Sequence, residues 1–388
     1  MKPSGARLLV GNLFFETEIA RQLMGGDPPN LSRAVTETVA GAATLLRAFA
    51  RERDRLWLPA SVDPARVLPV PGLPLPRLES GLPIEPASEI LSWAETPRIA
   101  NLRFSKAEPA EITLDAPLQE LLWQLPPPDP RTVMLVNHRS FCFDLLEGRG
   151  QLLPGARMLA TRAELDRHLQ SGTPGTQESW VLKAALSAAG RDRYIHPVGE
   201  NLDPLKVQRR IERLFRDHSP LLFEPWMDRT ADFGCAAVLT PSELRLASFH
   251  KLLVDSQGRF KGIELRAGFR GIEELGEKER AQMEQALDTV AAALRKNRYT
   301  GPFGIDAWRY RQPDGTLAFQ PVGEINTRLT FGFVARTLVD RLREPLGLSP
   351  DARVRLLFGK GLPEARPGVI PLLAPHPASA AAAWIEVL

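Results

Sequence analysis

Residues 303–328 read FGIDAWRYRQPDGTLAFQPVGEINTR, and this stretch predicts a β-hairpin. Two segments with the residue preferences of strands, 303–310 and 317–326, flank the sequence PDG at 313–315. Proline followed by aspartate and glycine is a strong turn signal, because proline presets the backbone and glycine tolerates a positive φ. The polar residues on the two strands then indicate what the hairpin can do.

Three polar side chains of this hairpin are predicted to lie close together. Asp306 lies on the first strand, and Glu324 and Asn326 lie two residues apart on the second, so the latter two share a face. The turn brings Asp306 opposite residues 322–324, with the parity set by loop length or by a bulge. Paired carboxylates repel each other without a cation, and Mg²⁺ prefers oxygen ligands of this kind. The set predicts a Mg²⁺ site, with solvated charges on an outer hairpin face as the alternative.

An arginine follows these candidate ligands along the same strand. Arg328 comes two residues after Asn326, and its planar fork suits phosphate groups. The run GID at 304–306, followed by Glu324-x-Asn326-x-Arg328, resembles the Mg²⁺-binding pattern of the ATP-grasp superfamily. The resemblance implies that Asp306, Glu324 and Asn326 bind Mg²⁺ that bridges the ATP phosphates. It also implies that Arg328 is a catalytic residue near the transferred γ-phosphate or the acyl phosphate.

Segments farther upstream match other parts of the same superfamily, in the same order. Lys183 ends an apolar strand and resembles the strand lysine that contacts ATP phosphates. Arg162 opens a helix where the superfamily more often has lysine, and an exposed arginine at a helix start is the alternative. The loop at 187–193 contains one glycine, whereas the phosphate-covering loop of the superfamily is usually richer in glycine. Arg191 and Arg193 are candidates to cover the phosphates instead.

The sequence LLFEPWM at 221–227 resembles the strand that links the two ATP-grasp lobes and whose backbone contacts adenine. The resemblance implies that Glu224 faces the adenine amino group and that Asp232 holds the ribose hydroxyls. Pro225 has no N–H, so an amide contact with adenine must come from a neighbour such as Met227. A buried strand that simply ends at Pro225 remains the alternative.

The order of the predicted elements indicates an α/β or α+β protein. The resemblance implies a three-domain ATP-grasp architecture with the nucleotide between a small lid lobe and a mixed-sheet carboxyl-terminal lobe. These divisions are an amino-terminal α/β substrate domain over 1–152 with a Pro-rich insertion at 59–98, the lid lobe over 153–222, and the catalytic lobe over 223–388 with a Pro/Ala-rich tail. The elements predicted from local patterns are strands over 7–10, 132–137, 156–160, 179–184, 221–223, 244–254, 259–265, 353–358 and 384–388, and helices over 32–53, 162–169, 205–217 and 279–297.

Composition excludes several classes of protein. The chain has 388 residues, of which 44% are hydrophobic and 24% charged, enough for two or three folded domains. Its net charge of +3 lacks the concentrated basic excess of a nucleic-acid binder. Cys142 and Cys235 are its only cysteines, which excludes a disulfide framework. The chain has no apolar run of roughly 20 residues, and residues 1–18 do not resemble a signal peptide. We therefore expect a cytoplasmic protein with no nucleic-acid or membrane partner.

The resemblance implies a ligase. A carboxylate of a small molecule or peptide attacks the γ-phosphate of ATP, and the acyl phosphate then reacts with an amine or similar nucleophile. The implied cofactors are ATP and Mg²⁺, with Mn²⁺ as an alternative ion. A phosphotransferase without ligation and a degenerate nucleotide-binding regulatory protein remain alternatives, and the oligomeric state stays open. The substrate carboxylate needs a cation, and the loosely placed candidates are Arg139, His250, Lys251, Arg266, Arg270 and Arg309.

Overall fold

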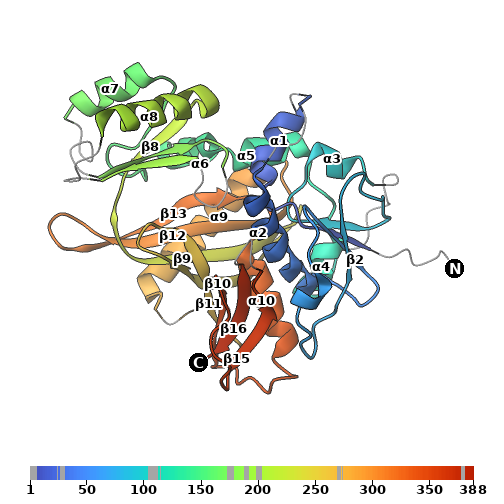
Figure 1. Ribbon diagram of the computed structural model, residues 1–388. Helices are drawn as coiled ribbons and strands as arrows, with labels where there is room; N and C mark the ends of the chain where they lie inside the picture. The colour runs from blue at the N-terminus through green and yellow to red at the C-terminus, as the bar shows by residue number, and fades with distance from the viewer. Residues whose placement is uncertain are drawn as a thin grey trace.

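Figure 1 shows the computed structural model of the chain, whose fold is mixed α/β as the sequence predicts. The structure describes residues 7–23, 25–26, 31–103, 112–113, 115–172, 179–187, 192–197, 203–268, 272, 274–376 and 381–388. Within these ranges the strands form a parallel sheet of four strands, a small antiparallel sheet of four and a large antiparallel sheet of eight. Among the helices of these ranges, none is long and apolar enough to cross a membrane.

The parallel sheet lies nearest the amino terminus, with strand order β3-β2-β1-β4. Its central strand β1 is completely buried and apolar, as is typical of a parallel strand with neighbours on both sides. The elements of this region are β1 (Leu8–Val10), α1 (Phe15–Leu23), α2 (Arg33–Ala43), the 3₁₀ helix η1 (Thr44–Phe49), β2 (Arg55–Leu58), the 3₁₀ helix η2 (Pro64–Arg66), β3 (Arg77–Ser80), β4 (Ile90–Ser92), α3 (Pro97–Ala100) and α4 (Leu118–Gln124).

The helix predicted over 32–53 begins as expected but ends early. Ser32 caps α2, because its hydroxyl accepts a hydrogen bond from the Val35 N–H. At the other end the Thr44 hydroxyl donates to the Gly41 carbonyl, and the chain tightens into η1. The apolar residues of η1 remain buried, so the helical spacing of the sequence reflects two consecutive helices of different pitch.

The proline-rich stretch contributes more than an extended surface segment. It supplies β3, a strand without proline, to an edge of the parallel sheet. Val62, Val67 and Val70 from this stretch are buried in the core. Val67 also forms a β-bridge with Leu373, close to the carboxyl end of the chain. This segment therefore connects the amino-terminal sheet with a strand near the carboxyl end of the chain.

The strand predicted over 132–137 is wrong, because this segment is helical. Helix α5 (Pro130–Asn137) begins after Asp129, whose carboxylate accepts hydrogen bonds from the backbone N–H groups of residues 131 and 132. Pro130 fits the first helical position, since its missing N–H has no partner there in any case. Helix α6 (Arg139–Glu147) follows after a single residue, His138, which caps it. The apolar run of α5 therefore marks the buried side of a short helix.

The small sheet has a core of its own. Its strand order is β5-β8-β6-β7, and α7 and α8 cover one side of it, as Figure 1 shows in green. Thr161 caps α7 by accepting from the Glu164 N–H, as the sequence predicts. The elements are β5 (Arg157–Leu159), α7 (Arg162–Gln170), β6 (Trp180–Ala184), β7 (Arg193–His196), α8 (Pro204–His218) and β8 (Leu221–Pro225).

The large sheet has the order β13-β12-β9-β10-β11-β14-β16-β15 and is antiparallel in every described pairing, where the resemblance implies a mixed sheet. Short turns join β9 to β10, β10 to β11 and β12 to β13, and such turns require antiparallel neighbours. Strands β9 and β15 of this sheet were not predicted from the sequence. The elements are β9 (Asp228–Leu239), β10 (Leu244–Val254), β11 (Phe260–Arg266), α9 (Glu277–Lys296), β12 (Gly301–Arg311), β13 (Leu317–Asn326), α10 (Phe331–Leu342), β14 (Arg353–Gly359), β15 (Val369–Leu373) and β16 (Ala382–Val387).

The predicted hairpin forms one edge of the large sheet. Its apolar residues, such as Phe303 and Ile305, belong to the same core as the buried stripe of α9. Asp306 alternates with them and therefore lies on the opposite face of the sheet. That face is turned toward the small sheet, as Figure 1 shows. A cleft lies there, and residues of α5, α6, β8 and β13 line it, Glu324 among them.

Candidate functional site

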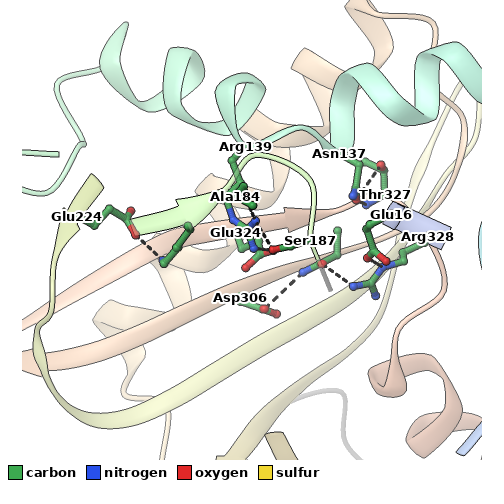
Figure 2. Close-up of polar contacts among 12 residues, drawn as sticks. Glu16, Asn137, Arg139, Ala184, Ser187, Glu224, Asp306, Glu324, Thr327 and Arg328 are labelled. Atoms are coloured by element: carbon green, nitrogen blue, oxygen red, sulfur yellow. Dashed lines mark hydrogen bonds and ion pairs between the residues drawn. The ribbon is translucent and has the colours of Figure 1, made fainter. Parts of the chain in front are cut away.

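The site is built on the strand pair β12–β13. Asp306 pairs directly with Glu324, and the next pair on the same face is Gly304 with Asn326. The Asn326 amide donates to Asp306 Oδ2 at 3.4 Å. Figure 2 shows Asp306 and Glu324 close to each other at the two strands. The structure therefore brings the two carboxylates and the carboxamide together, as the hairpin pattern predicts.

A bulge in β13 sets this register. Asp306 faces Glu324, but Trp308 faces Gln320, so three residues of β13 stand opposite one residue of β12. Pro321, which cannot donate a ladder hydrogen bond, lies in this bulge. Gly323 lies there too, and a Cβ on it would come within 1.7 Å of the Trp308 ring. The bulge, which needs a glycine at position 323, thus sets the register in which Asp306 pairs with Glu324.

The two carboxylates do not titrate alike. Burial in the cleft and, to a smaller extent, the nearby charge of Glu324 raise the pKa of Asp306 to about 7. Burial alone would also raise the pKa of Glu324, but the charges of Arg139, Lys183, Arg328 and Arg229 together lower it. Without a bound cation, Asp306 is therefore the carboxyl group that holds a proton near neutral pH. A divalent cation beside Asp306 would stabilise its ionised form.

Arg139 connects the small sheet with the acidic pair. Its Nη2 donates to Glu324 Oε1 at 2.8 Å, and its Nη1 donates to the Ser187 hydroxyl at 3.0 Å and to the Ala184 carbonyl. Its own N–H donates to the Ala185 carbonyl at 2.9 Å. The first residue of α6 thereby holds the end of strand β6 close to the acidic pair. Figure 2 shows Arg139 pointing down from α6 toward Glu324.

Lys183 and Glu224 face each other across strands β6 and β8 of the small sheet. They form an ion pair, and both side chains are largely buried. The Lys183 ammonium also lies 5.9 Å from the centre of the Trp308 ring, which belongs to the hairpin opposite. The small sheet thus presents a lysine and a glutamate toward the acidic pair.

Arg328 is held from three sides. Its Nε donates to Glu16 Oε1 at 2.9 Å, its Nη2 donates to Asn326 Oδ1 at 2.9 Å, and its Nη1 donates to the Leu329 carbonyl at 3.2 Å. Glu16 lies on α1 and is almost fully buried. Burial raises the pKa of Glu16, although the charge of Arg328 opposes the shift. Glu16 therefore fixes Arg328 from the amino-terminal part of the chain.

A third group lies where β8 leads into β9. Asp232 is buried and accepts a hydrogen bond from Arg229 Nη1 at 2.9 Å. The Arg229 guanidinium lies 3.8 Å from the centre of the Trp308 ring. The Trp226 N–H donates to the Ser179 carbonyl at 2.7 Å, whereas the Met227 N–H makes no hydrogen bond within the described part of the chain. Met227 is thus the amide next to Pro225 that is available to a ligand.

The cleft has the donor set that Mg²⁺ and a polyphosphate require. Asp306, Glu324 and Asn326 offer oxygen atoms, which suit a hard cation. Four cationic side chains act on Glu324, and cations in such numbers suit a polyanion. Burial and the charge of Glu324 both raise the pKa of Asp306, and a bound cation would offset that repulsion. The residues present therefore fit a metal ion bound together with phosphate groups.

Some sequence-predicted residues lie elsewhere. Arg162 pairs with Asp166 one turn along α7, and no contact in the described ranges joins it to the cleft. Arg193 donates to the Gln257 carbonyl at 2.6 Å and thus ties β7 to the β10–β11 turn. Arg191 lies outside the described residues, as do residues 188–190 of the predicted phosphate-covering loop.

Of the candidate partners for a substrate carboxylate that the structure describes, only Arg139 lies at the acidic pair. His250 is a core residue, because it is buried between Gly234 and Gly332 and lies 3.2 Å from the Ser248 hydroxyl. The remaining candidates pair elsewhere or cannot be placed: Lys251 with Glu274, Arg266 with Asp351 and Arg309 with Glu279, while Arg270 lies outside the described residues.

Sequence reasoning missed three residues of the site. Glu16 and Arg229 carry no motif signal, because their partners are distant in sequence or depend on the fold. Asn137 ends the segment that the sequence predicts as a strand, and it lies at the last position of α5. Its Oδ1 accepts from the Thr327 N–H at 3.1 Å and fixes the backbone that leads to Arg328. A pattern search could not find these residues, since no local spacing connects them.

No protein-family model matches the sequence, and no curated protein matches it significantly. Solved structures match over nearly the whole chain. N5-carboxyaminoimidazole synthetase from Staphylococcus aureus, complexed with ADP, superposes with a TM-score of 0.56 at 9% identity, over 100% of this chain and 94% of that chain. The biotin carboxylase domain of Hydrogenobacter thermophilus 2-oxoglutarate carboxylase gives 0.57 at 12% identity, over 99% and 86%.

Biotin carboxylase from Campylobacter jejuni superposes with a TM-score of 0.54 at 10% identity, over 99% of this chain and 88% of that chain. These neighbours are ATP-grasp enzymes, and the chain has the ATP-grasp fold that its sequence motifs imply. At such low identity the likeness shows the fold alone.

Proposed function

We propose that this protein is a Mg·ATP-dependent ligase that activates a carboxylate as an acyl phosphate for attack by an amine or a similar nucleophile. The observation that carries the proposal is the pairing of Asp306 with Glu324 beside Asn326, with cationic side chains around them. The fold neighbours support it, because one structure holds ADP and another holds MgADP and bicarbonate. Positioning and charge neutralisation are what phosphoryl transfer requires from a protein.

In this proposal the hairpin holds the metal and the small sheet acts as a lid over the nucleotide. Asp306, Glu324 and Asn326 would hold Mg²⁺, which would supply charge neutralisation at the phosphates. Lys183 contacts the phosphates and gives up its ion pair with Glu224, which is then able to accept from the adenine amino group. Met227 offers its N–H to adenine, and Asp232 accepts from the ribose hydroxyls. Arg162 is left out, because its guanidinium pairs with Asp166.

The chemistry runs in two steps. A substrate carboxylate oxygen attacks the γ-phosphorus and ADP leaves, and the amine then attacks the acyl carbon and phosphate leaves. Arg328 stabilises the charge of the transferred phosphoryl group, because Glu16 and Asn326 fix its guanidinium beside the metal ligands. Arg139 is the candidate partner of the substrate carboxylate, since it already binds a carboxylate at 2.8 Å.

Two other functions compete with the ligase. A phosphotransferase would use the same metal site and stop at the phosphorylated product. A degenerate nucleotide-binding protein would not need a half-buried carboxylate pair, whose mutual repulsion a bound cation relieves. The acidic pair therefore favours a site that binds Mg²⁺.

The test measures Mg²⁺-dependent ADP release, with bicarbonate as the first carboxylate supplied and hydroxylamine as a trap for acyl phosphates. Asp306→Asn and Glu324→Gln should each lower the rate by about a hundredfold or more. Asp314→Asn in the exposed turn of the same hairpin is the matched control and should keep the wild-type rate. Unchanged ADP release in both cleft variants contradicts the metal site. ADP release without hydroxamate, across a panel of carboxylates, favours the phosphotransferase.

A further inference from the structure

The contact between Arg139 and Glu324 uses an oxygen atom of the proposed metal site. Arg139 Nη2 donates to Glu324 Oε1 at 2.8 Å, and Glu324 forms no other ion pair in the described part of the chain. The Glu324 side chain is 33% exposed, so a metal ion can reach it from solvent. A divalent ion on the same carboxylate would bring two cationic groups close together, where like charges repel. Binding of either cation to Glu324 therefore disfavours the other.

Arg328 contacts the metal ligands in a different way. Its Nη2 donates to Asn326 Oδ1, which belongs to a neutral amide, and its Nε donates to the buried carboxylate of Glu16. Glu16 lies outside the acidic pair and balances the charge of this arginine. Arg328 therefore does not depend on a metal ligand for its negative partner.

Arg139 has no second carboxylate partner among the described residues. Its Nη1 donates to the Ser187 hydroxyl at 3.0 Å and to the Ala184 carbonyl, and both are neutral groups. Its side chain is only 11% exposed, so water solvates the charge poorly. A cation that is largely withdrawn from water is costly without an anionic partner. Arg139 can therefore leave Glu324 readily only when another anionic group takes the place of that carboxylate.

We propose that Arg139 couples the binding of the metal ion to the binding of an anion. It holds Glu324 in the metal-free protein and moves to an anionic oxygen group of the bound ligands when a metal ion takes Glu324. This inference rests on the proposed function, because it requires Glu324 to be a metal ligand. The receiving group is a nucleotide phosphate or the substrate carboxylate, since both match the planar fork of a guanidinium. Arg139 is thereby a positioning residue of the metal site.

The experiment is a calorimetric titration of the nucleotide-free protein with Mg²⁺ alone and, separately, with Mg·ADP. Arg139→Met removes the charge and keeps a long side chain. This variant should bind Mg²⁺ alone about tenfold more tightly than the wild type, because Glu324 has lost the cation that competes with the metal. If a phosphate receives Arg139, the same variant should bind Mg·ADP about tenfold more weakly.

Acetate distinguishes the two anions. If the substrate carboxylate receives Arg139, acetate should tighten the binding of Mg²⁺ to the wild type and leave the affinity of Arg139→Met unchanged. In that case Arg139→Met should also bind Mg·ADP more tightly than the wild type. If a phosphate receives Arg139, acetate should have no effect on either protein. Both results support the exchange, and they differ in the anion that they identify.

Arg229→Met is the matched control for the loss of a positive charge. The charge of Arg229 also lowers the pKa of Glu324, but its guanidinium pairs with Asp232 and has no hydrogen bond to Glu324 in the described part of the chain. Its affinity for Mg²⁺ alone should stay within about threefold of the wild type. An equal gain in Arg139→Met and Arg229→Met overturns the proposal, because the contact with Glu324 would then have no special effect.

A second variant and the remaining outcomes separate this inference from the proposed function. Arg139→Lys keeps the charge, and its affinity for Mg²⁺ alone should lie between those of the wild type and Arg139→Met. If Arg139→Met binds Mg²⁺ alone no more tightly than the wild type, while the wild type binds Mg·ADP, the exchange is wrong and the metal site stands. A merely structural arginine would give this result. If neither protein binds Mg²⁺ with or without ADP, the metal site and the exchange both fail.

Discussion

At the scale of single residues, the acidic pair makes nucleotide binding depend on pH. In the metal-free protein Asp306 has a pKa of about 7, and it must lose its proton to bind Mg²⁺. Below pH 7 the proton competes with the metal, so protonation of Asp306 should lower the affinity for Mg·ADP by about fivefold from pH 7 to pH 6. Titration calorimetry over this range measures the effect.

The nucleotide also titrates near neutral pH, so the test compares two proteins. Asp306→Asn has no carboxyl group to protonate and should show a shallower pH dependence than the wild type. If the affinity for Mg·ADP changes equally with pH in both proteins, the pKa of Asp306 is not raised.

Glu16 acts through Arg328. Replacing Glu16 with Gln keeps the shape of the side chain but removes the charge that holds the guanidinium. We expect kcat for ADP release to fall by about tenfold or more, with the KM for ATP within about twofold of wild type, because Arg328 contacts only the transferred group in the proposed mechanism.

Glu18→Gln is the matched control for this variant. Glu18 is also buried on α1 and pairs with Arg98, away from the acidic pair. Both variants remove one partner of a buried ion pair, so their stabilities should fall together. A similar loss of kcat in Glu18→Gln would mean that both substitutions lower activity by destabilising the protein. Glu16 would then have no specific role in positioning Arg328.

At the scale of elements, the bulge in β13 predicts an effect of Gly323→Ala. The added Cβ would meet the Trp308 ring within 1.7 Å, so the ring must move, and Arg229 lies against that ring. We expect a loss of about 1 to 3 kcal/mol in the free energy of unfolding and weaker Mg·ADP binding. Denaturant unfolding and calorimetry measure these changes.

Gly361→Ala is the control for this substitution. A Cβ on Gly361 would meet no atom within 4 Å among its described surroundings. Its stability and nucleotide affinity should match the wild type. If Gly323→Ala behaves like Gly361→Ala, then the contact between the bulge and Trp308 does not define the site.

The elements also show what the sequence could and could not predict. The β12–β13 hairpin and α9 were predicted well, because their apolar spacing and turn residues act locally. The segment 132–137 was assigned to a strand, because its apolar run is too short for periodicity to separate strand from helix. Asp129 followed by Pro130 is a typical helix start, and this pair was the local signal that favours a helix over a strand. At the site, the metal ligands followed from one hairpin, whereas Glu16 depends on a contact over 312 residues of sequence.

At the scale of the whole molecule, His250 should make stability fall in mild acid. Burial lowers its pKa to about 4, whereas an unfolded histidine titrates near 6.5. Below pH 6.5 the unfolded chain binds a proton that the folded chain does not, so stability decreases as pH falls from 6.5 toward 4. At pH 5 this residue should contribute a loss of about 2 kcal/mol relative to pH 7.5.

The measurement compares urea unfolding of the wild type and His250→Gln at these two pH values. The variant lacks the titrating group, so its stability should change less between pH 7.5 and pH 5. A variant with the same pH dependence as the wild type contradicts the assignment of His250 as a neutral core residue.

The bulge at 321–323 divides the hairpin into two parts that should tolerate insertions and deletions differently during evolution. The turn at 312–316 lies at the exposed end, while β9 and the bulge hold the pair of Asp306 and Glu324 in register. An insertion or deletion in the turn changes the reach of the hairpin and leaves that pair in place. One within the bulge moves Glu324 to the other face of the sheet. Related chains should therefore vary in length at the turn and keep the spacing between residues 320 and 324.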